Sequence, residues 1–440
     1  MSAAAAPPNG NAVGLAPAEG PVLARRQVHA VAGCYFVASF AALGLPPFLT
    51  EILPELGDTT ARWAGVLYIV PTVFGAVGAP FWGRLADRYG RRRLLLRAQL
   101  GLAVSFLLAG WSDSIATFTA ALVLQGILGG TFAASNGYLG AALEGPALSK
   151  ALTLMQGAAR AALVFAPIVV GSLSPWLSPH RQYALLAVLP LIAALLICAL
   201  PESRGGRAEA VAKDDPETES KPVPAPKTPA VSPPEPAPAP ASTPETAPTP
   251  EPVTSLRALY ALEFAFVFST VISFPYLVSL IEELLPGTSP AVSGVLFALP
   301  HLCYLGTAMA VHKAFHRRPR LGLALGFLCI ALGLAGHGVA DSLPVLVVVR
   351  LVLGAGLTLG LVCLSVLAAG CAKGRAPGGM FGSLEFFSKA GAVAAGIAAA
   401  VGNSFFGPAA PVVTGAALAL ATIVPTVLPL VNPLRTRWSR

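Results

Sequence analysis

Two acidic side chains inside long apolar segments are the features of this sequence with the most capacity for chemistry. Of the 21 acidic residues, nineteen fall in polar, terminal or turn segments, whereas Glu263 and Glu385 stand within apolar runs. An ionisable group at membrane depth costs a few kcal/mol, so it normally faces a partner or a wet cavity. A carboxylate held in this way can take up a proton and release it when a cation approaches, and we therefore treat Glu263 and Glu385 as candidate proton sites. An alternative for Glu263 is an edge residue whose side chain reaches the membrane surface.

Other polar residues in apolar segments extend this set. They are Gln125, Arg160, His301, Arg350 and Lys389. Lys389 either contributes to substrate binding or forms a local i,i+4 pair with Glu385. His301 is either a proton-linked site or a hydrogen-bonded packing residue, and Gln125 binds either substrate or a neighbouring helix.

The segments that must position these side chains are helices in a lipid bilayer. The chain has 440 residues, of which 55% are hydrophobic and 11% charged, whereas a soluble domain has about 25% charged residues. A helix that crosses a bilayer needs about 20 mostly apolar residues. Such runs predict twelve spans, at 28–50, 62–82, 94–111, 115–141, 152–174, 182–200, 256–280, 291–312, 320–340, 343–370, 380–405 and 411–430. The predicted class is an all-α membrane protein.

The distribution of basic residues predicts the orientation. With the N-terminus in the cytosol, 24 of the 29 lysines and arginines lie in cytosolic segments and only Arg62 and Arg181 lie in outer loops. This bias places both termini in the cytosol. The net charge of +8 therefore reflects topology, and no nucleic-acid partner is expected.

Composition divides the chain into five parts. Residues 1–24 form a predicted disordered cytosolic tail without the pattern of a cleaved signal peptide. Residues 25–200 and 256–432 form two predicted six-helix bundles, and 433–440 a basic tail. Between the two bundles, residues 201–255 contain fifteen prolines. This composition predicts a disordered cytosolic linker, which is either a plain spacer or a ligand for an SH3-type domain.

The two predicted bundles repeat one another. A shift of 229 residues aligns Leu45-Pro46 with Phe274-Pro275, and Gly65 with Gly294. A shift of 225 residues aligns Arg160 with Glu385, so that opposite charges occupy equivalent positions in the two halves. Duplicated halves are typical of secondary transporters, which hold substrate between two bundles.

One segment resembles a known family signature. Residues 83–92 read GRLADRYGRR, which is similar to the loop signature of the major facilitator superfamily, Gly-x-x-x-Asp-(Arg/Lys)-x-Gly-(Arg/Lys)-(Arg/Lys). The resemblance implies two pseudo-symmetric six-helix bundles and alternating access. It also implies a conformational latch in which Asp87 approaches the start of the eleventh helix at Phe381-Gly382. The residues that match are Gly83, Asp87, Arg88, Gly90 and Arg91.

Two further family patterns are only partly present. The antiporter element of the fifth helix, Gly-Pro-x-x-Gly-Gly, is reduced to Ala166, Pro167 and Gly171, which favours an exporter over an importer. The arginine pattern of the fourth helix is absent, because Leu122 stands at that position. A similar pattern instead begins at Arg350 in the tenth predicted helix.

Together these features predict a transporter and exclude an enzyme, since no metal-ligand spacing, paired intramembrane aspartates or nucleophile constellation is found. The six cysteines are read as small apolar residues. The expected function is proton-coupled export of a small organic molecule, a polar metabolite such as a siderophore or a drug, by a functional monomer with no cofactor. Import of a nutrient or metabolite, and a transport-inactive scaffold that acts through the linker, are the alternatives.

Overall fold

The fold follows from the absence of water in a bilayer, where every backbone polar group must be paired within the segment that carries it. In the computed structural model, described for residues 25–131, 134–135, 138–139, 143, 145–199, 254–372 and 377–431, the regular elements are all helices. The predicted tails, and the linker except its last two residues, lie outside the described residues.

The helices of the first half precede the linker and those of the second half follow it. The first half contains α1 (Arg25–Gly44), η1 (Pro46–Phe48), α2 (Leu49–Glu55), α3 (Ala64–Tyr89), α4 (Arg91–Gly110), α5 (Ile115–Leu128), α7 (Gly145–Leu173), α8 (Pro179–Leu186) and α9 (Val188–Cys198). The second half contains α11 (Leu256–Val271), η2 (Phe274–Tyr276), α12 (Leu277–Leu284), α13 (Pro290–Phe315), α14 (Pro319–Ala335), η3 (Gly336–Val339), α15 (Leu343–Ala372), α16 (Pro377–Phe406) and α17 (Ala410–Val431).

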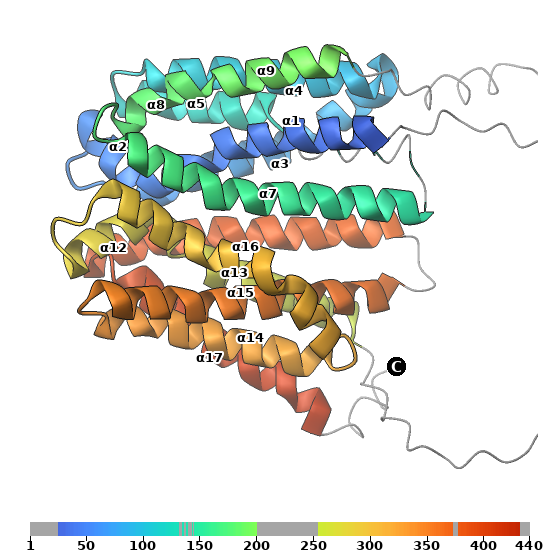
Figure 1. Cartoon of the computed structure of the whole chain (residues 1–440), viewed down its shortest axis with the longest axis vertical. Helices are drawn as coiled ribbons and strands as arrows, with labels where there is room; N and C mark the ends of the chain where they lie inside the picture. The colour runs from blue at the N-terminus through green and yellow to red at the C-terminus, as the bar shows by residue number, and fades with distance from the viewer. Residues whose placement is uncertain are drawn as a thin grey trace, which may run out of the picture.

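The described helices account for the twelve predicted spans. Ten helical segments are long and apolar enough to cross a membrane, and Ala64–Gly78 and Ile115–Leu128 are shorter apolar helices at the second and fourth positions. The first half occupies one side of the molecule and the second half the other, with α7 and α16 along the boundary (Figure 1). We call the end where α9 stops and α11 starts the linker end, and the other, which carries α2, α8 and α12, the far end.

Proline interrupts corresponding helices of the two halves. After α1 the chain forms the short helix η1 at Pro46, and after α11 it forms η2 at Pro275. Proline lacks an amide hydrogen and so cannot continue the ladder of hydrogen bonds in a helix. The two short helices contact each other across the boundary, and their equivalence supports the predicted repeat.

Three predicted spans differ from the structure. The fourth helix was expected to be continuous to residue 141 but is interrupted after Leu128, because Gly129 and Gly130 leave helical geometry and Gly130 has φ +83°; helical residues resume at Thr131. The sixth is divided into α8 and α9, and Pro190 in the first turn of α9 removes a hydrogen bond to Leu186.

The second predicted span is also wrong at its end. It was expected to stop near residue 82 and give way to a turn from Gly83, but α3 remains helical to Tyr89. The turn is a single residue, Gly90, with φ 95° and ψ 140°. Only glycine adopts that conformation without strain, so the signature encodes two helical turns followed by a sharp corner.

Candidate functional site

Arg160 lies at the boundary between the halves, midway along α7. Its guanidinium carbon is 5.7 Å from the centre of the Tyr304 ring, which belongs to α13 of the other half. Arg160 also interacts electrostatically with Tyr35 of α1 and Glu263 of α11. A permanent positive charge therefore faces the second half.

Glu263 of α11 provides an acidic group opposite Arg160. Its carboxylate accepts a hydrogen bond from the hydroxyl of Ser388 on α16, and it lies within electrostatic range of Arg160 and Glu385. We call Tyr35, Arg160, Glu263, Tyr304, Glu385 and Ser388 the central cluster. It contains one cation and two carboxylates, and its members come from five helices of both halves, an arrangement that can bind a proton or a charged small molecule.

Glu385 and Lys389 form the local pair that the sequence left as an alternative. Lys389 Nζ lies 3.4 Å from Glu385 Oε1, one turn apart on α16, and their side chains are 40% and 49% exposed. An exposed i,i+4 pair of this kind contributes only a few tenths of a kcal/mol in water. Both groups therefore remain accessible to a ligand or to water.

Sequence reasoning did not identify three members of the central cluster. Tyr35, Tyr304 and Ser388 are polar side chains in apolar helices, and Tyr35 is buried. Polar side chains of this kind are a weak signal, because only the packing of the helices shows which of them meet a charged residue.

His301 and Arg350 lie together, apart from the rest of the candidates. Both line a small cavity between α11, α13 and α15, and His301 also interacts electrostatically with Arg160. Arg350 donates from Nε to the carbonyl oxygen of Leu296 at 2.8 Å and from Nη2 to that of Phe297 at 3.3 Å. Gln125 lies in α5, which packs on α3 and α4 of its own half.

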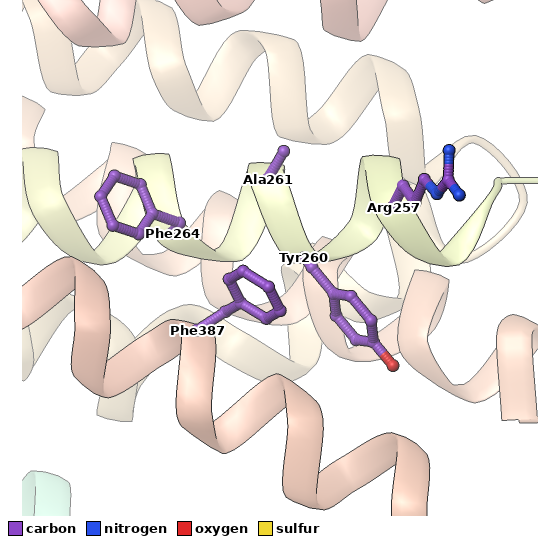
Figure 2. Close-up of a pocket in the computed structure, with 5 residues that line it drawn as sticks. All are labelled: Arg257, Tyr260, Ala261, Phe264 and Phe387. Carbon is purple, nitrogen blue, oxygen red and sulfur yellow. The ribbon is translucent and has the colours of Figure 1, made fainter.

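An open pocket of about 360 Å³ lies at the linker end of the second half. It is lined by Arg257, Tyr260, Ala261, Phe264 and Phe387 (Figure 2). The Tyr260 and Phe387 rings stack, with centroids 5.0 Å apart and planes at 11°. Glu263 and Ser388 are adjacent in sequence to Phe264 and Phe387, so the pocket lies on the same two helices, α11 and α16, as the acidic part of the central cluster.

The far end is closed by two related helix crossings. A Cβ atom at Gly65 of α3 would lie 2.6 Å from the carbonyl oxygen of Gly396 on α16. A Cβ atom at Gly294 of α13 would clash with the carbonyl oxygen of Pro167 on α7, and one at Gly171 of α7 would clash with that of Pro290. Because the repeat aligns Gly65 with Gly294, and Gly171 with Gly396, both crossings have the same construction.

The element predicted in the fifth helix therefore packs helices together. Pro167 and Gly171 contact α13 of the other half, while Ala166 is fully buried against Gly44 of α1. Small residues at such positions let two backbones approach closely. Its use as an antiporter signal stays a prediction.

Apolar packing differs between the two ends. Two hydrophobic clusters join both halves. One, near the far end, includes Phe48 and Leu67 of the first half with Ile272 and Ala395 of the second, and the other includes Leu163 of the first half with Ile281 of the second. Tyr276 reinforces the former, because its hydroxyl accepts from the Gly65 amide at 3.1 Å and donates to the Arg62 carbonyl at 3.0 Å. Two other clusters of described residues each stay within one half. The halves are thus joined most firmly at the far end.

The predicted latch is only partly described. Gly83 and Asp87 lie in the last turns of α3, but their side chains are outside the described set. Arg88 lies over the Tyr89 ring, with its guanidinium carbon 5.4 Å from the ring centre. Arg91 begins α4 directly after the Gly90 corner. The approach of Asp87 to Phe381-Gly382 stays a prediction, since those side chains are also outside the described set.

Twelve apolar helices in two related halves around a polar cluster define a membrane transporter fold. The chain belongs to the Major Facilitator Superfamily, whose family model matches residues 31–286. It is a multi-pass membrane protein.

Relatives and solved structures agree with this assignment. The chain is 33% identical over 173 residues to "Multidrug resistance protein MdtG" of Dickeya zeae, a match that covers 38% of this chain and 41% of that protein. With the same protein of Citrobacter koseri it shares 33% identity over 193 residues, 42% of this chain and 46% of the relative. The match thus spans less than half the length of these relatives.

Two solved structures share the fold. The human organic anion transporter MFSD10 (TETRAN) superposes with a TM-score of 0.59 at 22% identity, covering 91% of this chain and 99% of the other. A peptide transporter POT in complex with sulfate gives a TM-score of 0.66 at 15% identity, covering 95% and 97%. At these identities the likeness concerns the fold alone.

Proposed function

We propose that this protein exports a small organic molecule in exchange for protons by alternating access. The observation that carries the proposal is the central cluster, in which Arg160 from one half faces Glu263 and Glu385 from the other. A site shared by both halves changes its exposure when the halves rock against each other. The packed far end and the pocket at the linker end correspond to a state that faces the linker side.

The orientation of the chain in the membrane identifies the side that this state faces. The positive-inside bias supports a cytosolic linker and cytosolic termini, so the pocket opens towards the cytosol, where an exporter collects its substrate. If the source is a Gram-negative bacterium, the membrane is the inner membrane. Each chain carries a complete cluster, which supports a functional monomer.

The substrate class follows from the charges and rings around the cluster. A molecule with both charged groups and a planar apolar part would pair with Arg160 and the carboxylates and would stack against Tyr260 and Phe387. A polar charged metabolite, such as a siderophore, and a charged drug both fit this description. The MdtG relatives are named as multidrug resistance proteins, which supports the drug.

Proton coupling is assigned to Glu263 and Glu385. In the proposed cycle a carboxylate is protonated from outside, and the proton is released to the cytosol as substrate approaches Arg160. Substrate and proton then occupy the cluster alternately, which gives an exchange in opposite directions.

The test uses carboxamide variants in an efflux-deficient strain. Cells loaded with ethidium, a cationic probe, are energised, and efflux is followed with and without a pH gradient. We expect Glu263→Gln and Glu385→Gln to reduce gradient-dependent efflux about tenfold or more, whereas Glu283→Gln, an exposed carboxylate on α12, leaves it unchanged. Wild-type proton-linked efflux in both cluster variants would refute the assignment.

A second measurement addresses substrate and direction. Mass spectrometry of metabolites in a knockout strain should show one or more polar compounds retained inside the cells. Depletion of a compound inside, together with its accumulation in the medium, would instead identify an importer.

A further inference from the structure

Three basic side chains that are not members of the central cluster are buried inside the second half. Arg350 of α15 is 1% exposed, His301 of α13 is 2% exposed and His337 of η3 is 1% exposed. His301 interacts electrostatically with Arg350, and so does His337. None of the three is paired with a carboxylate in the described part of the chain.

Each of these side chains has a nitrogen that finds no hydrogen-bond partner among the described residues. These atoms are Arg350 Nη1, His301 Nδ1 and His337 Nε2. The rest of the Arg350 guanidinium is engaged, since Nε and Nη2 donate to the carbonyl oxygens of Leu296 and Phe297. Two hydrogen bonds thus hold the guanidinium in place, while its Nη1 atom has no partner among the described residues.

Two of these three side chains, Arg350 and His301, line a small cavity. Its lining consists of Arg350, His301, Thr270, Phe274, Pro300 and two leucines. Its volume of about 10 Å³ leaves room for a single small occupant. The Thr270 hydroxyl already donates to the Phe266 carbonyl at 2.9 Å, so the two basic side chains provide the donors that remain for an occupant.

The charge around the cavity selects the kind of occupant. A guanidinium stays protonated in a protein, and a buried charge without a counter-charge is strongly unfavourable. The charged groups that act on His301 are Arg350 and Arg160, and both are positive. An anion supplies the missing counter-charge, and the small size of the cavity favours a monatomic ion.

We propose that this cavity binds a single small monovalent anion, chloride under physiological conditions, held by Arg350 Nη1 and the His301 ring. The anion neutralises Arg350 and links α13 to α15 inside the second half. The site is separate from the central cluster and does not depend on the direction of transport or on proton coupling.

The test is a halide titration of the purified full-length protein in detergent at constant ionic strength. Chloride replaces gluconate stepwise while the melting temperature is recorded, and bromide is tested in parallel. A ligand that binds only the folded state raises the melting temperature as its concentration exceeds its dissociation constant. We expect a saturable increase with chloride and bromide. A melting temperature that does not depend on halide at constant ionic strength would refute the site and would indicate that water fills the cavity.

Two histidine variants locate the effect. His301→Gln removes one ligand and should raise the halide concentration for half-maximal stabilisation by about tenfold, as expected for the loss of one charge-assisted hydrogen bond. His312→Gln changes an exposed histidine at the other end of α13 and should titrate like the wild type. An unchanged titration of His301→Gln would place the halide elsewhere and overturn the proposal.

A structural measurement does not depend on any variant. Crystals grown in bromide should show an anomalous peak between Arg350 and His301. Bromide peaks confined to the surface would contradict the proposal even if the melting temperature responded to halide.

Discussion

Gly65 of α3 and Gly396 of α16 face each other across the boundary between the halves, each closer to the backbone of the other than a side chain would allow. A Cβ atom on Gly396 would lie 2.8 Å from the Gly65 carbonyl oxygen. The same relationship recurs where Gly294 of α13 meets Pro167 of α7. The far end is therefore closed by backbone contact at two crossings, and a single methyl group at either should act on the conformational equilibrium.

Alanine at the crossings provides the first prediction. Gly294→Ala and Gly171→Ala insert a methyl group against backbone that cannot move aside easily, at a cost of about 1–3 kcal/mol to the state closed at the far end. We expect lower transport and faster labelling of a cysteine introduced at the far end by an impermeant maleimide.

Matched controls exist on the same helices. Gly306 on α13 and Gly157 on α7 have open space where a Cβ atom would stand, so Gly306→Ala and Gly157→Ala should behave like the wild type. Equal effects of the crossing and control substitutions would show that loss of glycine flexibility, and not helix approach, is responsible.

The hydrogen bond between Arg350 and Leu296 provides the second prediction. Pro300 has no amide hydrogen to offer the Leu296 carbonyl four residues earlier, and Arg350 Nε occupies that carbonyl at 2.8 Å. Pro300→Ala restores a backbone donor, so Arg350→Met should cost about 1 kcal/mol less in the Pro300→Ala background than alone. Chemical denaturation of the four proteins measures this coupling, and strictly additive effects would contradict it.

Gly90 provides the third prediction. A positive φ of 95° strains any residue with a side chain, and Gly90→Ala should lower stability by about 1–2 kcal/mol. Asp87→Asn should leave the melting temperature unchanged and reduce transport, because the predicted latch requires a negative charge and the corner does not. If Asp87→Asn transports like the wild type, the latch is not part of the cycle.

Much of the fold could be predicted from the sequence, because lipid forces each long apolar run to become a helix. The twelve spans follow from this rule, whereas the predicted spans 28–50 and 256–280 ran through the breaks that the structure shows at Pro46 and Pro275. The helical extension of α3 to Tyr89 could not be predicted, since a charged segment at the membrane surface can form either a helix or a loop.

The charged residues of the candidate site were predictable from the sequence, but the groups that they contact were not. Glu263 and Arg160 stand out in apolar sequence, but the contact of Arg160 with Tyr304 depends on the rotation of α7 and α13 about their axes. The attachment of Arg350 to two carbonyl oxygens was likewise not predictable, because backbone acceptors carry no sequence signature.

Lys389 provides the fourth prediction. Its pair with Glu385 is exposed, so Lys389→Gln should change the free energy of unfolding by less than about 0.5 kcal/mol. The variant removes one positive charge beside the central cluster and should shift the substrate preference towards cations. The check is to compare ethidium efflux with export of an anionic dye. Parallel changes in both rates would indicate that Lys389 does not face the substrate.

The ends of the linker provide the fifth prediction. Arg92 of α4 donates from Nε to the Ile197 carbonyl at 3.2 Å, near the end of α9, and Arg320 of α14 donates from Nη2 to the Thr254 hydroxyl at 3.1 Å, just before α11. Both helices are thus fixed by their own half. Replacement of residues 203–250 by a glycine-serine segment of equal length should therefore preserve the melting temperature and ethidium efflux. A scaffold that acts through this segment predicts a different result, in which the cellular phenotype is lost while the protein remains folded and abundant in the membrane.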